Sequence, residues 1–331
     1  MDSTQAPSTA ARIYVAGHRG LAGSAFVRAL RKNGYRNLIL RTHAELDLAE
    51  GSAVARFFAS ERPEYVFIAA ARVGGIFANS TYPADFIREN LAIQLNIIQH
   101  AYTVNVKRLL FLGSSCIYPR LAPQPIKEEY LLSGPLEPSN RPYAIAKIAG
   151  IEMCWSYNRQ YGTRYLAAMP TNLYGPGDNY NLNTSHVIPA IIRKMAEAHE
   201  QGHSSVTLWG TGTPRREFLY SEDLADACLF LLNLPDEQFL PVANSQHEPP
   251  LVNVGYGEDV SIRELATMIA DVVGFQGTIV FDTSKPDGTP RKLLEISRMT
   301  RLGWKPSVSL RQGLEQAYAA FRYERATLQR A

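Results

Sequence analysis

Cysteine is scarce in this sequence, and its distribution excludes two common ways of stabilising a fold. Cys116, Cys154 and Cys228 are widely spaced among 331 residues, and no pair has the C-x-x-C spacing. An odd, scattered set of cysteines predicts neither a disulfide framework nor a metal site. We therefore expect no bound metal ion and a cytoplasmic location.

Long apolar runs and concentrations of one charge are absent too. No run approaches the roughly 18 residues of a membrane-spanning helix, and residues 1–11 lack the charged and apolar sections of a secretory signal. The net charge is only +3, with Lys and Arg spread along the chain. These absences argue against a membrane protein and against a nucleic-acid-binding surface.

Apart from these absences, the composition is typical of a packed α/β protein, with 46% hydrophobic residues. Short apolar runs alternate with segments of helical apolar spacing, which predicts a Rossmann-type, doubly wound parallel sheet. The predicted strands are 13–16, 38–40, 66–69, 109–112, 165–169, 206–209 and 251–254. The predicted helices are 22–32, 52–60, 84–102, 143–161, 187–198, 221–232 and 261–273. Ser261 and Glu264 have the spacing of a capping box at the start of the last helix.

A glycine-rich loop follows the first predicted strand. Gly17, Gly20 and Gly23 are spaced G-x-x-G-x-x-G, and the first helix opens inside the motif. Glycine allows a tight turn and a close approach of the backbone to a pyrophosphate at the helix N-terminus. An ordinary strand-to-helix turn is the alternative, but the flanking strand and helix favour a dinucleotide site.

The end of the second predicted strand indicates which dinucleotide is bound. An acidic residue there would hold the ribose 2′-hydroxyl and repel a 2′-phosphate, whereas this sequence reads Leu40-Arg41-Thr42-His43. Arg41 and Arg19, neither with an obvious acidic neighbour in its loop, are predicted to converge on the 2′-phosphate of NADP, with His43 beside them. A pair of solvated surface arginines is the alternative.

Tyr143 and Lys147 lie four residues apart, and therefore on one face of a helix. A tyrosine titrates near 10, so a pKa near neutrality needs a shift of about 3 units, for which a nearby ammonium and a nicotinamide ring provide a bias. Ser114 follows the fourth strand, at the edge of the sheet where ligands bind. We expect Tyr143 to give a proton to a carbonyl oxygen that Ser114 also contacts. An exposed helical pair is the alternative.

With the glycine loop, Ser114 and Y-x-x-x-K in this order, the sequence resembles the extended short-chain dehydrogenases. Five stretches are similar to the GDP-L-fucose synthase family within them: AGHRG, GSSCIYP, MPTNLYGP, SHVIPA and KPDGTPRK. The resemblance covers residues 13–320. It implies an NADPH-dependent enzyme that inverts C3 and C5 of GDP-4-keto-6-deoxy-D-mannose and then reduces its C4 ketone, giving GDP-L-fucose.

The resemblance also implies the residues that carry out the two inversions. Cys116 is expected to be the base, and His186 the acid, with His186 also beside the cofactor. A thiol titrates near 8.5 and an imidazole near neutrality, which suits these tasks. Taken alone, Cys116 reads as a small buried packing residue, and His186 as a hydrogen-bonding residue at the start of a helix.

A further set of residues is expected, from the same resemblance, to bind the substrate. Arg216 and Lys292 are assigned to the GDP diphosphate, which needs paired cations. Asn172 is either a ligand of the sugar or a turn former, and Val187 either contacts the nucleoside or belongs to the core. The whole expected set is Asn172, Val187, Lys194, Trp209, Arg216 and Lys292. Lys194 stands where the family often has Arg.

These assignments divide the chain into parts. We expect a disordered tail, an NADP-binding Rossmann domain with a returning segment, and a smaller C-terminal substrate lobe. In that order, the parts are 1–11, 12–173 with 217–255, and 174–216 with 256–331. Dimers of the family pack the helices expected at 84–102 and 143–161 against their mates, so a homodimer is expected.

Two other functions compete with this one. A UDP-hexose 4-epimerase would return the hydride to the sugar, but such enzymes prefer an acidic residue where Arg41 stands and lack the pair of Cys116 and His186. A catalytically silent NADP-binding scaffold is the second alternative. The presence of Ser114 and of Y-x-x-x-K argues against it.

Overall fold

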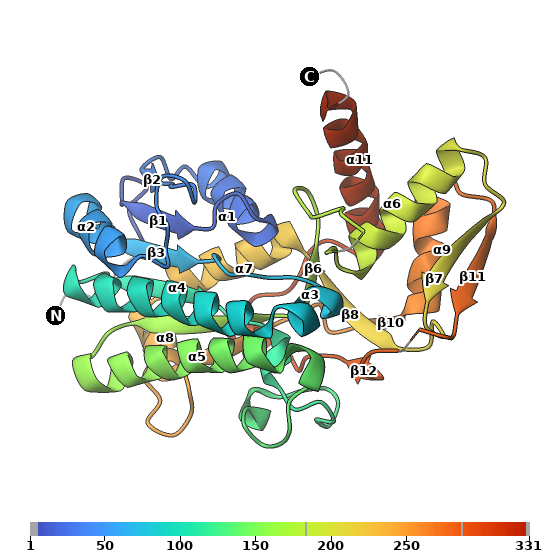
Figure 1. Ribbon diagram of the computed structural model, residues 1–331. Helices are drawn as coiled ribbons and strands as arrows, with labels where there is room; N and C mark the ends of the chain where they lie inside the picture. Colours follow the sequence, from blue (N-terminus) through green and yellow to red (C-terminus); the bar gives the residue numbers. More distant parts are fainter. Residues whose placement is uncertain (1–5, 183, 286, 329–331) are drawn as a thin grey trace.

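Six strands form the central sheet of the protein: β1 (Ile13–Ala16), β2 (Leu38–Ile39), β3 (Tyr65–Ile68), β4 (Arg108–Leu112), β5 (Tyr165–Pro170) and β9 (Leu251–Val254). In the computed structural model, which describes residues 6–182, 184–285 and 287–328, all neighbours are parallel and the order is β2-β1-β3-β4-β5-β9 (Figure 1). Because β1 pairs with both β2 and β3, the strand order reverses beside it. The carboxyl ends of β1 and β3 are therefore the place where a ligand crevice is expected.

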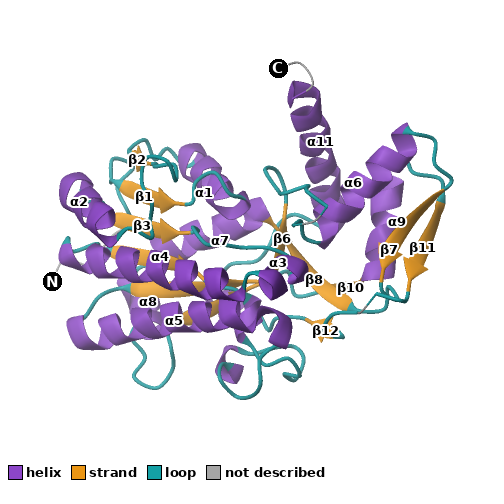
Figure 2. Ribbon diagram, viewed as in Figure 1, coloured by secondary structure: helices purple, strands orange, loops and turns teal. Residues whose placement is uncertain are grey.

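Helices cover both faces of this sheet. On one face lie α1 (Leu21–Lys32) and α7 (Ser221–Asn233), and on the other lie α2 (Gly51–Glu61), α4 (Pro83–Thr103) and α5 (Arg141–Tyr161). Helices α4 and α5 run side by side (Figure 2). Strands buried on both faces have to be apolar throughout, which explains the continuous apolar runs in the sequence.

A second lobe lies beyond the carboxyl ends of the strands. One of its small sheets has the order β10-β8-β12, with β6 also paired to β8, and the other is formed by β11 and β7. Phe218, Leu265 and Leu314 belong to its own hydrophobic core. Its elements are β6 (Asn172–Tyr174), α6 (Val187–Glu200), β7 (Ser205–Trp209), β8 (Arg215–Tyr220), β10 (Asp259–Ser261), α9 (Ile262–Val273), β11 (Thr278–Asp282), β12 (Arg291–Lys292) and α11 (Leu310–Leu328).

Segments near both ends of the chain pack into the hydrophobic core of the six-stranded sheet. After β12 it forms α10 (Ser297–Leu302), and Met299 and Trp304 are buried in the core on the α1 and α7 face. Ala11 is buried in the same core, and the Thr9 carbonyl accepts a hydrogen bond from the Arg36 amide at 3.2 Å. The described end of the expected disordered tail is thus tied to the fold, and residues 1–5 lie outside the described residues.

The predicted α/β fold class is confirmed, and each predicted element is present with ends that agree within two residues. The predicted capping box of α9 is also confirmed, because Ser261 and Glu264 cap each other's backbone amides. The prediction missed the strands β6, β8, β10, β11 and β12, and the helices α3 (Ile76–Thr81), α8 (Asp236–Ala243), α10 and α11. It also missed the short 3₁₀ turns η1 (Ser115–Ile117), η2 (Glu128–Tyr130) and η3 (Pro138–Asn140). Within the described ranges, no helix combines the length and apolar character needed to cross a membrane.

Candidate active site

The loop between β1 and α1 is packed so closely against neighbouring backbone that two of its glycines have no room for a side chain. Gly17 has a φ of 82°, and a Cβ on it would lie 2.6 Å from the Ala70 amide nitrogen. A Cβ on Gly23 would lie 2.1 Å from the Gly17 carbonyl oxygen. Helix α1 begins after Gly20, and no described side chain caps its first amides. Those amides and the helix dipole fit a pyrophosphate, so the residues present fit a dinucleotide.

The structure corrects one premise about Arg41. The Arg41 guanidinium forms an ion pair at 2.5 Å with Glu61, which lies on α2 and outside the loop that contains Arg41. The same guanidinium lies over the Phe57 ring. Hydrogen bonds from Thr42 lower the pKa of Glu45, and the charges of Arg41 and Arg19 lower it further. Both arginines therefore lie within electrostatic reach of the Glu45 carboxylate, and their convergence on a 2′-phosphate stays a prediction.

His43 lies at the outer end of this loop. Its side chain is 85% exposed, and its Nδ1 lies 3.9 Å from an Asp47 carboxylate oxygen. Arg19 is exposed as well. Both side chains are thus able to reach a ligand in the loop, while Arg41 is held in place by Glu61 and Phe57.

Ser114, Tyr143 and Lys147 meet at the carboxyl end of β4. The Lys147 ammonium is buried, donates to the Leu112 carbonyl at 2.8 Å and lies 5.9 Å from the centre of the Tyr143 ring. Ser114 is hydrogen-bonded to Tyr143, and its Oγ accepts from the Cys116 amide at 3.2 Å. The three side chains that the sequence assigns to reduction are therefore adjacent in space.

The sequence predicts a lowered pKa for Tyr143, and this prediction is wrong for the effect of the protein's own groups, which raise that pKa. Burial raises the pKa of Tyr143, the neighbouring Cys116 adds to this effect, and the hydrogen bond with Ser114 opposes it. Burial lowers the pKa of Lys147 to about 7. Desolvation of the phenolate outweighs the hydrogen bond from Ser114. The phenol is therefore protonated at neutral pH, which is the form that a proton donor needs.

Cys116 has two polar neighbours besides Ser114. Its Sγ accepts a hydrogen bond from Asn140 Nδ2 at 3.2 Å and one from Lys292 Nζ at 3.7 Å. These three side chains line one small pocket. Cys154 and Cys228 are fully buried instead. Within the described chain, Cys116 is therefore the one cysteine that reaches the cleft.

Asn140 is a residue that the sequence analysis missed. Its side-chain nitrogen Nδ2 donates a hydrogen bond to Cys116 Sγ. Its Oδ1 is buried and has no hydrogen-bond partner among the described residues. An unpaired buried acceptor of this kind is unfavourable unless a ligand supplies a donor. Its position three residues before Tyr143, at the end of η3 and the start of α5, was the only signal available in the sequence.

His186 is the residue that precedes α6, and its side chain is exposed. The surrounding protein atoms nevertheless lower its pKa, because they disfavour the imidazolium. The segment before it packs against the loop after β3: a Cβ on Gly75 would lie 3.4 Å from the Ser185 carbonyl oxygen. Gly74 in turn lies against Phe86, which is in edge-on contact with Tyr143. A chain of contacts thus links the His186 segment to Tyr143.

Arg216 and Lys292 are brought together by pairing of β8 with β12, in which they are direct partners. Burial lowers the pKa of Arg216, while Asp287 and Cys116 act in the opposite direction. The expected pair of cations is therefore present. Lys292 also contacts Cys116, so the diphosphate assignment and the catalytic thiol share one region.

The other expected substrate residues are more dispersed. Asn172 donates its amide to the Glu217 carbonyl at 2.9 Å, and Lys194 donates to the Thr207 carbonyl at 3.0 Å. Val187 is half-buried against the core of the second lobe. Trp209 is 68% exposed at the end of β7, with the Lys285 ammonium 5.7 Å from its ring. Of these side chains, Trp209 is exposed, whereas Asn172 and Lys194 are hydrogen-bonded to backbone carbonyls of the fold.

Comparison with known proteins identifies close relatives. Residues 13–243 match the model of the NAD dependent epimerase/dehydratase family. The chain is 56% identical to GDP-L-fucose synthase 1 of Arabidopsis thaliana over 93% of its own length and 92% of the relative's. It is 55% identical to GDP-L-fucose synthase of Escherichia coli (strain K12), over 94% of this chain and 96% of that protein.

A solved structure extends the similarity to the fold. A GDP-L-fucose synthetase from Naegleria fowleri bound to NADP superposes with a TM-score of 0.86 and is 28% identical. The superposition covers 99% of this chain and 98% of that one. The likeness therefore includes both lobes.

Proposed function

Because the chain belongs to the NAD-dependent epimerase/dehydratase family and, within it, to the GDP-L-fucose synthases, we propose that it converts GDP-4-keto-6-deoxy-D-mannose to GDP-L-fucose with NADPH. One observation carries the proposal beyond the family. Ser114, Tyr143 and Lys147 are adjacent, and Cys116 lies beside them with its thiol in a pocket. A proton donor for reduction and a base for epimerisation are thus available in one cleft.

Epimerisation precedes reduction because the C4 ketone acidifies the hydrogens on C3 and C5. Cys116 removes each proton as a base, and His186 returns one to the opposite face as an acid. The lowered pKa of His186 makes its imidazolium a stronger acid and also decreases the protonated fraction at neutral pH. Both centres are then inverted while the ketone is still in place.

Reduction uses the other set of residues. NADPH supplies a hydride to C4 when it is bound. Ser114 positions the ketone oxygen by a hydrogen bond, and Tyr143 transfers its phenolic proton to that oxygen as negative charge develops there. The protein then needs to recover one proton at Tyr143, and the buried Lys147 amine, whose pKa is lowered to about 7, lies 5.9 Å from the Tyr143 ring.

The two lobes have separate tasks in this proposal. The lobe built on the six-stranded sheet holds NADPH, with its pyrophosphate on the loop of Gly17, Gly20 and Gly23. The second lobe holds the GDP-sugar, with Arg216 and Lys292 on the diphosphate and Trp209 against the guanine. Cations on adjacent strands suit a ligand with two neighbouring phosphates.

We also infer that the protein forms a homodimer through α4 and α5. These helices pack against each other along their length, and each leaves an apolar side chain exposed, Leu95 on α4 and Ile145 on α5. A second copy would cover these side chains with its own pair of helices. Sedimentation should then give about twice the mass of one chain, and a single-chain mass would contradict the inference.

NADPH is expected to be preferred over NADH, because Arg41 stands where an acidic residue would favour NADH. Arg41→Asp places a carboxylate next to Glu61 and should lower kcat/KM for NADPH by at least about tenfold, narrowing or reversing the preference. Steady-state kinetics with both cofactors measure this ratio. Arg36→Asp, an exposed arginine before β2, is the matched control and should leave the ratio unchanged. Equal use of both cofactors by the wild-type protein would contradict the role of Arg41.

The proposed reaction is tested against its nearest rival by offering both substrates. GDP-4-keto-6-deoxy-D-mannose should cause NADPH absorbance to fall until one of the two is exhausted, whereas UDP-glucose should cause no change. If NADPH absorbance falls with neither of the two sugars, the catalytically silent NADP-binding scaffold would be favoured. Conversion of UDP-glucose to UDP-galactose without net use of the cofactor would favour the 4-epimerase.

A further inference from the structure

The small sheet that carries Arg216 and Lys292 has two chemically distinct faces. Along β8 and β12, Arg215 pairs with Arg291, and Arg216 pairs with Lys292. Because side chains alternate along a strand, the first pair points to one face and the second pair to the other. Lys292 contacts Cys116, so the face of Arg216 and Lys292 is the cleft face. Arg215 and Arg291 therefore point to the opposite face, where both reach Asp259, and Arg291 also borders the pocket that Cys116, Asn140 and Lys292 line.

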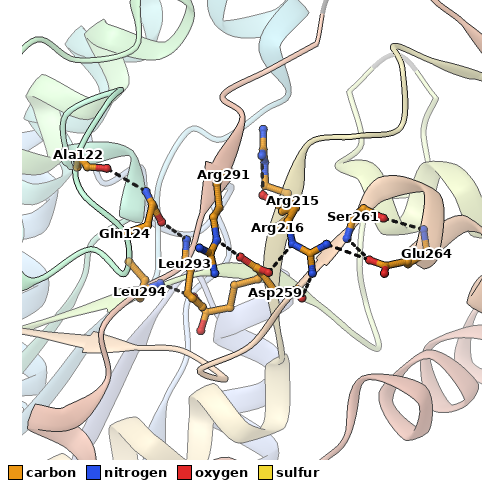
Figure 3. Close-up of polar contacts among 11 residues, drawn as sticks. Ala122, Gln124, Arg215, Arg216, Asp259, Ser261, Glu264, Arg291, Leu293 and Leu294 are labelled. Carbon is orange, nitrogen blue, oxygen red and sulfur yellow. Dashed lines mark hydrogen bonds and ion pairs between the residues drawn. The ribbon is translucent and has the colours of Figure 1, made fainter.

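Asp259 joins the two arginines on that opposite face. Its carboxylate accepts from Arg215 Nε at 2.7 Å and from Arg291 Nε at 2.5 Å (Figure 3). The Asp259 side chain is only 5% exposed, although it extends from β10 at the edge of the sheet. Burial would raise the pKa of Asp259, but the hydrogen bonds from the two arginines outweigh it and lower the pKa. The carboxylate is therefore charged and bridges β8 to β12.

Such a bridge is needed because β12 is a weak strand. It has only two residues, and both of its paired positions set a cation directly against a cation of β8. Like charges that face each other across a sheet are destabilising. The charge of Asp259 offsets the repulsion on its own face. On the cleft face, the charge of Asp287 acts on Arg216 and offsets part of the repulsion with Lys292, and an anionic ligand would neutralise more of it.

Other contacts fix the residues on either side of β12. Beyond Lys292, the Leu293 amide donates to Gln124 Oε1 at 2.8 Å, and the Leu294 amide donates to the buried Glu217 carboxylate at 2.9 Å (Figure 3). At the preceding end, the Pro290 carbonyl accepts from the Arg215 amide. Within the strand itself, the Asp259 bridge is the side-chain link that holds the register.

We propose that Asp259 is a positioning residue of the GDP-sugar site, which fixes the spacing of Arg216 and Lys292 from the opposite face of their sheet. The proposal rests on the GDP-binding role assigned above to those two cations. Asp259 touches no substrate atom itself. It acts by keeping β12 in register with β8, so that both cations meet the diphosphate without rearrangement.

The test is the affinity of the full-length protein for GDP, measured by calorimetry. Asp259→Asn keeps the size of the side chain but removes the charge that opposes the two arginines. The Kd for GDP is expected to rise about tenfold, while the Kd for NADPH, measured by its fluorescence, stays within about twofold. In turnover, the KM for the keto-sugar should rise with little change in kcat, as expected when binding is impaired.

A matched control separates positioning from general loss of stability. Asp223 is also a buried carboxylate, but it accepts hydrogen bonds from the Ser307 and Val308 amides, which are not part of β12. Asp223→Asn should lower the melting temperature without changing the Kd for GDP. Arg291→Gln, which removes one exposed partner of Asp259, is a milder second variant and should weaken GDP binding in the same way.

The possible results are distinct. Unchanged GDP affinity in both Asp259→Asn and Arg291→Gln would overturn the proposal. An equal loss in Asp223→Asn would also overturn it, since stability alone would then explain the effect. Failure of the proposed function would look different: GDP would bind, and Asp259→Asn would weaken it, but the keto-sugar would not be converted.

Discussion

Tyr143→Phe is expected to abolish reduction while NADPH binding is retained. The substitution removes the phenolic hydroxyl that is hydrogen-bonded with Ser114 but keeps the ring that packs against Phe86. General acid catalysis typically contributes a factor of about 10² to 10⁴, so a loss of kcat in that range is expected. NADPH oxidation gives the rate, and NADPH fluorescence gives the Kd.

A second tyrosine on the same helix provides the control. Tyr157 lies in the later part of α5, where its hydroxyl contacts Gln99 outside the cleft. Tyr157→Phe loses the same atom from the same helix and should turn over nearly normally. Near-normal reduction by Tyr143→Phe would remove Tyr143 from the mechanism. Loss of NADPH binding in that variant would show that its defect lies in the cofactor site.

Cys116→Ser is expected to block epimerisation while the reductase residues stay intact. Serine keeps the size and polarity of the side chain, but its hydroxyl is a far weaker acid than a thiol, so little base forms at neutral pH. In deuterated buffer with the keto-sugar and NADPH, the variant should incorporate little deuterium at C3 or C5, as read by NMR. Slow reduction to an unepimerised 6-deoxy sugar is the expected residual reaction.

The chain offers an internal control for removal of a thiol. Cys154 is fully buried in the core between α5 and the sheet, so Cys154→Ala changes packing but not the cleft. That variant should incorporate deuterium at the wild-type rate per folded molecule. Normal labelling at both carbons by Cys116→Ser would assign the base to another residue, and Cys116 would then be a packing residue.

The central sheet was predictable from the sequence because each strand is buried on both faces. Strands such as β1 and β3 are apolar at every position, and they are separated by helices whose apolar spacing is equally regular. The strands β8, β10 and β12 give no such signal. The cations Arg215, Arg216, Arg291 and Lys292 lie on β8 and β12, and Asp259 of β10 joins two of them although the three strands are far apart in the sequence.

The candidate site was predictable to the extent that its residues occur in local motifs. The i, i+4 spacing of Tyr143 and Lys147 and the glycine loop are read directly from the sequence. The contact of Lys292 with Cys116 joins residues 176 positions apart, and no local pattern contains it. The ion pair between Arg41 and Glu61 was missed for the same reason, since the partner comes from α2. The direction of the Tyr143 pKa depends on burial, which the sequence did not give.

One experiment tests the whole account most directly: the wild-type protein is incubated with GDP-4-keto-6-deoxy-D-mannose and NADPH in deuterated buffer, and the product is identified by NMR. The proposed reaction should give GDP-L-fucose with deuterium at both C3 and C5, and one NADPH should be oxidised for each product molecule. Reduced sugar without deuterium at either carbon would contradict the role in epimerisation. No oxidation of NADPH at all would contradict the assignment as an epimerase-reductase.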